Sequence, residues 1–288
     1  INVNFEKQNF GIAMTRKILF FSLFIMIMVS CNSGNTNSNS NQEIQSELER
    51  DSLLLVSQTD TPDEQSDRDD NIITALEQLN IKPEDCNMEY ITEKILPYDT
   101  DKSAIVIPKI SHVEEEDFFT MDAYILVFDH KEKKIVHQFY EKDAWTSDAM
   151  KFTGITIDTA PYKLNSSTRA FAVKVSYSGS SRVNPYSETL ISLFIPQGKK
   201  LVKVMDGYPI STFHGDFGAS CEGGTSQDVA TIFIMSEQST NGYKDIITKS
   251  TITYTTYDED CEESESMEYE TDTIRYQEGK YLFERRGY

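Results

Sequence analysis

Apolar segments with strand-like patterns dominate the chain from about residue 104 onward. They are rich in Val, Ile, Thr, Tyr and Phe, and clusters of Gly, Pro, Asn, Asp and Ser separate them, as is typical of β-strands. Eleven are recognisable: AIVIP, YILVF, KIVHQFY, ITIDT, AFAVKVSY, LISLFI, KLVKVM, VATIFIM, IITKSTITYTTY, MEYETDTIRY and KYLFE. No long helical pattern interrupts them, so the sequence predicts a single all-β domain over residues 71–288.

A different spacing marks the start of this domain. Residues 71–80 carry apolar side chains three and four positions apart, which predicts one short N-terminal helix with Asn71 as its N-cap and Pro83 beyond its end. Residues 31–70 are instead rich in Asn, Ser, Gln, Asp and Glu. Segments of that composition bury too little apolar surface to offset the entropy of ordering, so we expect a disordered tether before the domain.

Two of the predicted hairpins resemble each other. The segment YILVFDHKEKKIVHQF (residues 124–139) aligns without a gap on LISLFIPQGKKLVKVM (residues 190–205), and TIRYQEGKYLFE (residues 273–284) repeats the turn and the closing strand. A recurring hairpin predicts antiparallel repeats that form blade-like, four-stranded sheets. About three such units are too few to close a propeller, so a partial-propeller arrangement and a β-sandwich both fit.

The N-terminal region contains an apolar run over residues 18–29, directly after the basic residues Arg16 and Lys17. At about 1.5 Å per residue a helix of this run spans roughly 18 Å, short of the roughly 30 Å hydrocarbon core of a bilayer. The pattern therefore predicts a signal peptide over residues 14–30 and not a membrane-spanning helix. We expect residues 1–13, which precede Met14, to be an artefact of upstream translation.

The apolar run ends in Met28, Val29, Ser30 and Cys31. This stretch resembles the lipobox of bacterial lipoprotein precursors, although Met28 replaces the usual Leu, and the resemblance covers residues 14–31 alone. It implies that Cys31 becomes the first residue after cleavage and carries palmitate-type acyl chains. More than one acyl chain makes a membrane anchor durable. The implied location is the bacterial cell envelope, at the periplasmic face or the cell surface. We recognise no family resemblance in the folded body.

The charge of the chain limits its partners. The sequence has 27 basic and 47 acidic residues, a net charge of −20. Nucleic-acid binding requires Lys and Arg to neutralise phosphates, so this balance argues against it. It argues equally against peripheral attachment to anionic lipid, which leaves the N-terminal lipid as the expected link to the membrane.

Four cysteines are present: Cys31, Cys86, Cys221 and Cys261. With Cys31 lipidated, three remain in an oxidising compartment, and an odd number leaves one thiol over. Cys221 and Cys261 both lie in polar segments that flank a predicted strand pair, which favours a disulfide between them. A disulfide between Cys86 and Cys221 is the alternative.

The richest polar loop is SYSGSSRVNPYSE, residues 176–188. Its side chains suit a sugar or a small anion, with Arg182 as a planar group of several donors. The alternative is a structured hairpin end whose polar side chains bond to the backbone. The candidate ligand-binding residues in this loop are Tyr177, Ser180, Ser181, Arg182, Asn184 and Tyr186.

Trp145, the only tryptophan, is a further candidate because its ring could stack on a sugar, although capping the core is the alternative role. His214, Asp216 and Cys221 share a Gly-rich turn but lack the paired ligand spacing of zinc sites. The acidic residues 257–272 lack the spacing of a calcium loop. We therefore expect no metal, no cofactor and no catalytic set.

These observations predict a membrane-anchored envelope lipoprotein that acts as a binding or assembly module for an envelope protein or a glycan. Polar loops on a β framework without a catalytic set favour binding. The alternative is an envelope hydrolase acting on glycan or peptide, which a close pair of carboxylates with raised pKa in a cleft would support. A groove lined by Tyr, Trp and Ser without such a pair would favour binding.

Overall fold

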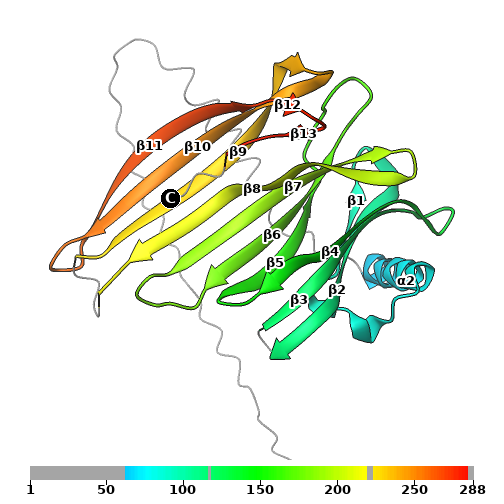
Figure 1. Cartoon of the computed structure of the whole chain (residues 1–288), viewed down its shortest axis with the longest axis horizontal. Coiled ribbons are helices and arrows are strands. Elements are labelled where there is room, and N and C mark those ends of the chain that lie inside the picture. The colour runs from blue at the N-terminus through cyan, green and yellow to red at the C-terminus, as the bar shows by residue number, and fades with distance from the viewer. Residues whose placement is uncertain (1–61, 116–117, 219–222, 285–288) are drawn as a thin grey trace, which may run out of the picture. The chain divides into compact units, whose positions relative to one another are not determined.

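The computed structural model describes residues 62–115, 118–218 and 223–284 (Figure 1). Within them the helices are α2 (Pro62–Leu79), η1 (Pro83–Asp85) and η2 (Met88–Tyr90). The first strands are β1 (Thr92–Leu96), β2 (Asp99–Glu115), β3 (Phe118–Asp129), β4 (Lys134–Ser147), β5 (Met150–Asp158) and β6 (Phe171–Gly179). The remaining strands are β7 (Tyr186–Gln197), β8 (Lys200–Asp216), β9 (Thr225–Thr240), β10 (Tyr243–Tyr257), β11 (Glu263–Ile274), β12 (Tyr276–Gln277) and β13 (Lys280–Tyr281).

Strands β1 to β11 form one continuous sheet. Two antiparallel meanders, β1–β2–β3–β4 and β5–β6–β7–β8, lie side by side because β4 pairs with β8 in a parallel sense. The end of β8 pairs with β9, and β10 and β11 follow as a three-stranded extension (Figure 1). Edge strand β5 lies against β1, β2 and β4, so the first eight strands curl into a nearly closed, barrel-like sheet. The prediction of a mostly β domain is confirmed.

The interior of this curled sheet is the main hydrophobic core. Alternate residues of neighbouring strands point inward, as the two-residue period of a strand requires. Val106 on β2, Ile125 on β3 and Phe152 on β5 are each at most 2% exposed. Aromatic residues fill the centre, where Phe194 packs 5.2 Å from Phe139 and 5.9 Å from Phe171 between ring centroids. The core thus joins the two meanders.

Helix α2 covers the outer face of β2 and β3. Ala75 and Leu76 of the helix pack on Ile105 and Ile107 of β2, and on residues of β3. Both faces of β2 are therefore buried, which explains why AIVIP is a continuous apolar run and not an alternating one. Gln78 fixes the end of the helix, because its side chain donates to the Lys133 carbonyl at 2.8 Å and accepts from the Ile135 amide at 3.0 Å.

A second cluster lies on the outer face of β6, β7 and β8. Ala172, Leu193 and Val204 are buried there beneath the segment between β5 and β6 and the C-terminal strands. Tyr281 of β13 anchors the C-terminal segment, since its hydroxyl donates to the Lys244 carbonyl at 2.7 Å. The three-stranded extension is thereby attached to the barrel through side chains as well as through the β8–β9 ladder.

The helix differs from its prediction. It begins at Pro62 and not near residue 71, so it starts within the range predicted as tether. Proline suits the first helical position because its φ is already fixed, and the acidic residues that follow it favour a helix N-terminus. Asn71 is not an N-cap; it lies inside the helix and is 5% exposed. Its side chain bonds to Glu93 on β1 and to Lys133 beyond β3.

Separate blade-like units are not seen. The two similar hairpins are β3–β4 and β7–β8, and both belong to the same sheet. The third segment forms only the short β12–β13 pair around a turn at Gly279, whose φ is 84°. Among the helices of the described residues, none combines the length and apolar character needed to cross a bilayer. The predicted signal peptide, the lipobox and most of the tether lie outside the described residues.

Candidate functional site

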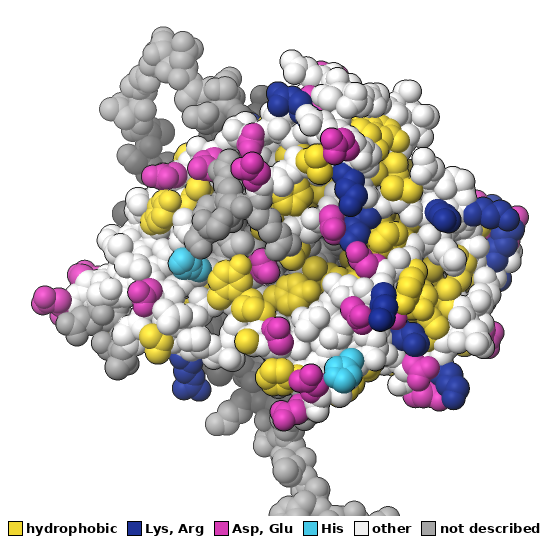
Figure 2. Space-filling view, viewed as in Figure 1, with side chains coloured by type: hydrophobic (Ala, Val, Ile, Leu, Met, Phe, Trp, Pro, Cys, Tyr) yellow, Lys and Arg dark blue, Asp and Glu magenta, His cyan; other side chains and the backbone are white. Residues whose placement is uncertain are grey.

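A cavity of about 130 Å³ lies inside the barrel at the seam between the two meanders. Strands β4 and β8 are parallel and share one register pair, Gln138 with Lys200. The cavity is lined by residues of both strands that follow this pair, and β3, β6 and β7 complete its lining. In Figure 2, hydrophobic side chains gather in a hollow near the centre of the face shown, beside a column of interspersed basic and acidic side chains.

Two of the predicted ligand-binding residues, Trp145 and Tyr177, line this cavity. Both contact the fully buried Phe152, with ring centroids 6.0 Å and 5.4 Å away, respectively. Tyr90 packs on Phe152 from another side at 4.9 Å, and its hydroxyl donates to the Phe152 carbonyl at 3.2 Å. The cavity therefore has aromatic walls held in place by a shared central ring.

Lys203 of β8 forms the polar part of the cavity lining. Its ammonium lies 2.6 Å from Glu141 Oε2 on β4 and 2.7 Å from Asp206 Oδ1. The Lys203 side chain is only 13% exposed, whereas the two carboxylates are 40% and 55% exposed. The ammonium also lies 5.5 Å from the centre of the Phe139 ring. This ion triad bridges the two strands where their backbones no longer pair.

A backbone irregularity next to the triad shapes β8. Gly207 has a φ of 64°, which glycine adopts without strain, and its amide donates to the Ser192 hydroxyl at 2.9 Å. The register of β7 with β8 shifts nearby. Such a bulge bends a strand away from its neighbour. Gly207 and Ser192 both line the cavity.

The rest of the predicted binding loop lies elsewhere. Ser180, Ser181, Arg182 and Asn184 are exposed at the tip of the β6–β7 hairpin. Backbone bonds from residues 215 and 217 to the carbonyls of residues 185 and 183 fix this tip to the end of β8, and Asn184 donates to Asp216 at 3.1 Å. These bonds match the alternative interpretation of a structured hairpin end. Ligand binding by this loop stays a prediction.

Tyr186 belongs to the base of that loop. Its hydroxyl donates to Glu188 Oε2 on the same strand at 3.3 Å, and its backbone pairs with His214 on β8. It is not among the residues that line the cavity at the seam. The structure thus brings Tyr177 and Trp145 to one site and leaves the other five candidates outside it.

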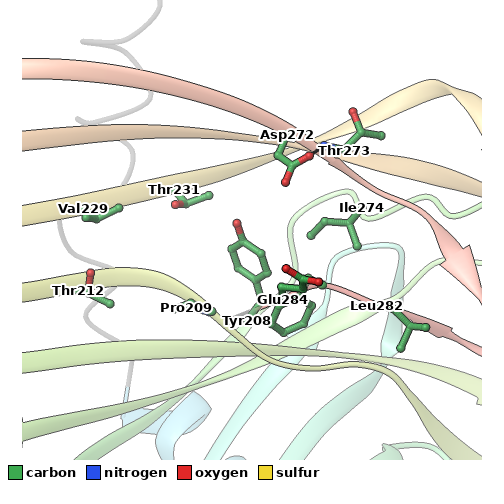
Figure 3. Close-up of a pocket in the computed structure, with 11 residues that line it drawn as sticks. Tyr208, Pro209, Thr212, Val229, Thr231, Asp272, Thr273, Ile274, Leu282 and Glu284 are labelled. Carbon is green, nitrogen blue, oxygen red and sulfur yellow. Dashed lines mark hydrogen bonds between the residues drawn. The ribbon is translucent and has the colours of Figure 1, made fainter. Parts of the chain in front are cut away.

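A second cavity, of about 310 Å³, lies between β8, the extension β9–β11 and the C-terminal segment. Figure 3 shows Tyr208, Thr231 and Asp272 reaching toward it from different strands. The Tyr208 ring packs on Phe233 at 5.2 Å and on Phe283 at 4.8 Å. Tyr208 therefore serves packing between β8 and the extension, and the described lining contains no basic residue.

The predicted disulfide involves Cys221, which lies outside the described residues. The structure does bring the neighbourhoods of both cysteines together, because Gly223 donates to the Tyr257 carbonyl at 3.1 Å and Tyr257 donates to the Gly224 carbonyl at 2.9 Å. The pairing of Cys221 with Cys261 stays a prediction. Cys86, the partner in the alternative pairing, is a free, buried thiol.

The sequence reasoning missed the charged residues of the seam. Lys203 lies two residues after the buried Leu201, and Glu141 lies two residues after Phe139. Because successive side chains of a strand point to opposite faces, each charged side chain lies on the same face of its strand as that apolar residue. A charged residue at an apolar position of a strand was therefore the signal in the sequence that could have identified these two residues. Among the described residues, no group of three or more His, Cys, Asp or Glu side chains is placed to hold a metal ion. Comparison with protein families, known proteins and solved structures finds no match for the chain.

Proposed function

We propose that this chain is a lipid-anchored protein of the bacterial cell envelope that binds one sugar ring of a glycan in the cavity at the β4–β8 seam. The anchor rests on the lipobox resemblance at Cys31. The binding function rests on the combination of aromatic walls with the Lys203 triad. Sugars need such a combination, because their ring faces pack on aromatic side chains while their hydroxyls both donate and accept hydrogen bonds.

The size of the cavity sets the size of the ligand. An engineered protein cavity of about 150 Å³ accepts a benzene molecule. The seam cavity, at about 130 Å³, is comparable and so suits a single ring, partly inserted, and not a long oligosaccharide. Further units of a glycan would lie outside it, along the exposed carboxylates of Glu141 and Asp206.

The position of Lys203 favours binding over hydrolysis. A glycosidase needs two carboxyl groups that face the scissile bond from opposite sides. Glu141 and Asp206 are close, but the Lys203 ammonium lies within 2.7 Å of both and occupies the space between them. A ligand hydroxyl can join this triad at its exposed edge, whereas a glycosidic bond has no room between the carboxylates.

Tryptophan fluorescence provides a direct test, because the only tryptophan lines the cavity. We expect titration with N-acetylglucosamine, its oligomers and other envelope sugars to change the emission of Trp145 saturably. Lys203→Met should weaken binding at least about tenfold, since hydrogen bonds to charged groups contribute about 1.5–3 kcal/mol. Tyr177→Leu should weaken it as well.

Arg182→Ala is the matched control, because Arg182 lies on the exposed loop tip and not in the cavity. Loss of binding in this variant with retention in Lys203→Met would move the site to the loop. Emission that does not respond to any sugar at millimolar concentration would contradict the glycan proposal. Release of shorter sugars during the titration would support the hydrolase instead.

A further inference from the structure

A second polar site lies on the other side of the barrel wall, beneath α2. Its centre is Glu93 of β1, whose side chain is 3% exposed. The Asn71 amide donates to Glu93 Oε1 at 3.2 Å, and the Ser103 hydroxyl donates to the same oxygen. His130 Nε2 also lies nearest to Oε1, at 3.5 Å. Every described partner of this carboxylate is thus on one oxygen.

The other oxygen, Glu93 Oε2, is buried and has no hydrogen-bond partner among the described residues. Buried polar atoms are nearly always paired, because leaving one unpaired forfeits its interaction with water without replacement. An unpaired carboxylate oxygen is the more unfavourable case, since it carries charge. Burial raises the pKa of Glu93, against the opposing effects of its hydrogen bonds and of nearby positive charge.

Glu93 lines a cavity of about 510 Å³ between α2, η2 and β1. Half of the lining is apolar: Ile72 and Ile73 come from the helix, and Met88 and Ile91 from the turn before β1. Ile73 is 44% exposed and Met88 is 49% exposed, so the apolar surface continues to the mouth of the cavity. This volume falls within the range of small-molecule sites.

The charges at this cavity decide what kind of ligand it suits. Arg68 and Asp69 also line it, with one charge of each sign. Glu93 is therefore the group that sets the sign of the site, and the strongly acidic chain adds a general attraction for cations. The order of contacts argues against a nucleophilic triad, because Ser103 and His130 both approach Glu93 and His130 does not stand between the other two.

We propose that this cavity binds a small amphipathic amine, with its ammonium group at the Glu93 carboxylate and its hydrocarbon part against Ile72, Ile73 and Met88. The ammonium supplies a hydrogen-bond donor, which Oε2 otherwise lacks. The apolar part of the lining accounts for the preference for an alkyl body over a simple inorganic cation. This site is separate from the seam cavity and does not depend on sugar binding there.

Calorimetric titration of the whole chain with three six-carbon probes tests the proposal. We expect n-hexylammonium to bind, n-hexanol to bind at least about tenfold more weakly and hexanoate to bind weakest, because only the first pairs its charge with Glu93. Glu93→Gln should remove the preference for hexylammonium over hexanol. Glu89→Gln, which changes an exposed carboxylate of η2, is the matched control and should leave all three affinities unchanged.

A variant at the mouth of the cavity keeps the test decisive if Glu93→Gln fails to fold. Ile73→Ser changes a half-exposed helix residue, and it should weaken hexylammonium and hexanol together because both lose the same apolar contact. Equal affinity of wild type for hexylammonium and hexanol would overturn the proposal. So would a preference for hexanoate, which would make Arg68 the anchoring group, or binding of hexylammonium that Ile73→Ser leaves unchanged.

Discussion

Replacing Lys203 with methionine tests whether the seam between the two meanders is held by charge. Methionine keeps a long, flexible apolar side chain, so the substitution removes the ammonium with little change in packing. Lys203 is the cation of the triad, and it joins Glu141 on β4 to Asp206 on β8. Without it, two carboxylates face each other across the gap.

The size of the effect follows from the distances. The bonds of 2.6 and 2.7 Å from Lys203 place Glu141 Oε2 and Asp206 Oδ1 no more than about 5.3 Å apart. At that separation two like charges repel by about 0.8 kcal/mol in water and by about 3 kcal/mol at an effective dielectric constant near 20. Because both carboxylates are partly exposed, we expect Lys203→Met to lower the free energy of unfolding by about 1–3 kcal/mol.

Urea unfolding of four variants provides the assay: wild type, Lys203→Met, Glu141→Gln and the double variant. Glu141→Gln removes one of the two repelling charges, so it should restore about 1 kcal/mol or more to the Lys203→Met background. The deficit should also shrink in 1 M salt, where the screening length of about 3 Å is shorter than the carboxylate separation. Equal stabilities of the Lys203→Met and double variants, unaffected by salt, would refute the electrostatic explanation of the seam.

Other predictions concern the core and the cysteines. Phe152→Ala should lower the free energy of unfolding by about 3–5 kcal/mol in urea titrations, because it empties a fully buried aromatic site. Burial raises the pKa of the Cys86 thiol to about 11, so at pH 8 a thiol reagent should modify it slowly in the folded protein and quickly in urea. Since the folded thiol holds its proton above the unfolded value of 9.0, this group should make the fold less stable as pH rises from there toward 11. Non-reducing peptide mapping should find Cys221 joined to Cys261, and reduction of this loop of about 40 residues should cost roughly 3–4 kcal/mol. Cys31→Ala should abolish metabolic labelling with a fatty-acid analogue; equal labelling of this variant would contradict lipidation.

The strands were predictable because their local patterns agree with their environments. AFAVKVSY and LISLFI became β6 and β7, each with one face in the barrel and the other beneath the segment between β5 and β6. The helix was only partly predictable. Its N-terminal half, from Pro62, is acidic and lacks the apolar spacing by which the sequence marks a helix. The apolar half, which packs on β2, was the half that the pattern identified.

The cavity at the seam was less predictable, because it depends on which distant strands become neighbours. The composition of the polar loop near Arg182 suggested a ligand-binding site. In the structure its polar groups mainly form hydrogen bonds within the hairpin end and to the end of β8. Trp145 and Tyr177 were identified one by one, but their shared contact with Phe152 is a property of the closed sheet. Lys203 became notable only with β4 beside it, since in sequence it is simply one of the two lysines in its strand.

The similarity of the two hairpins explains the seam once the topology is known. Strands β4 and β8 are the closing strands of equivalent hairpins, and they meet in parallel where one register pair forms. Neighbouring strands in a meander are connected by a short turn, which sets their pairing. No turn connects β4 to β8, so no local connection keeps these two strands paired along their length. Their backbones pair at that one position, and beyond it the Lys203 triad bridges the two strands with side chains. The repeated hairpin in this sequence therefore marks the two strands, β4 and β8, through which the two meanders pair. The cavity lies beside this pairing.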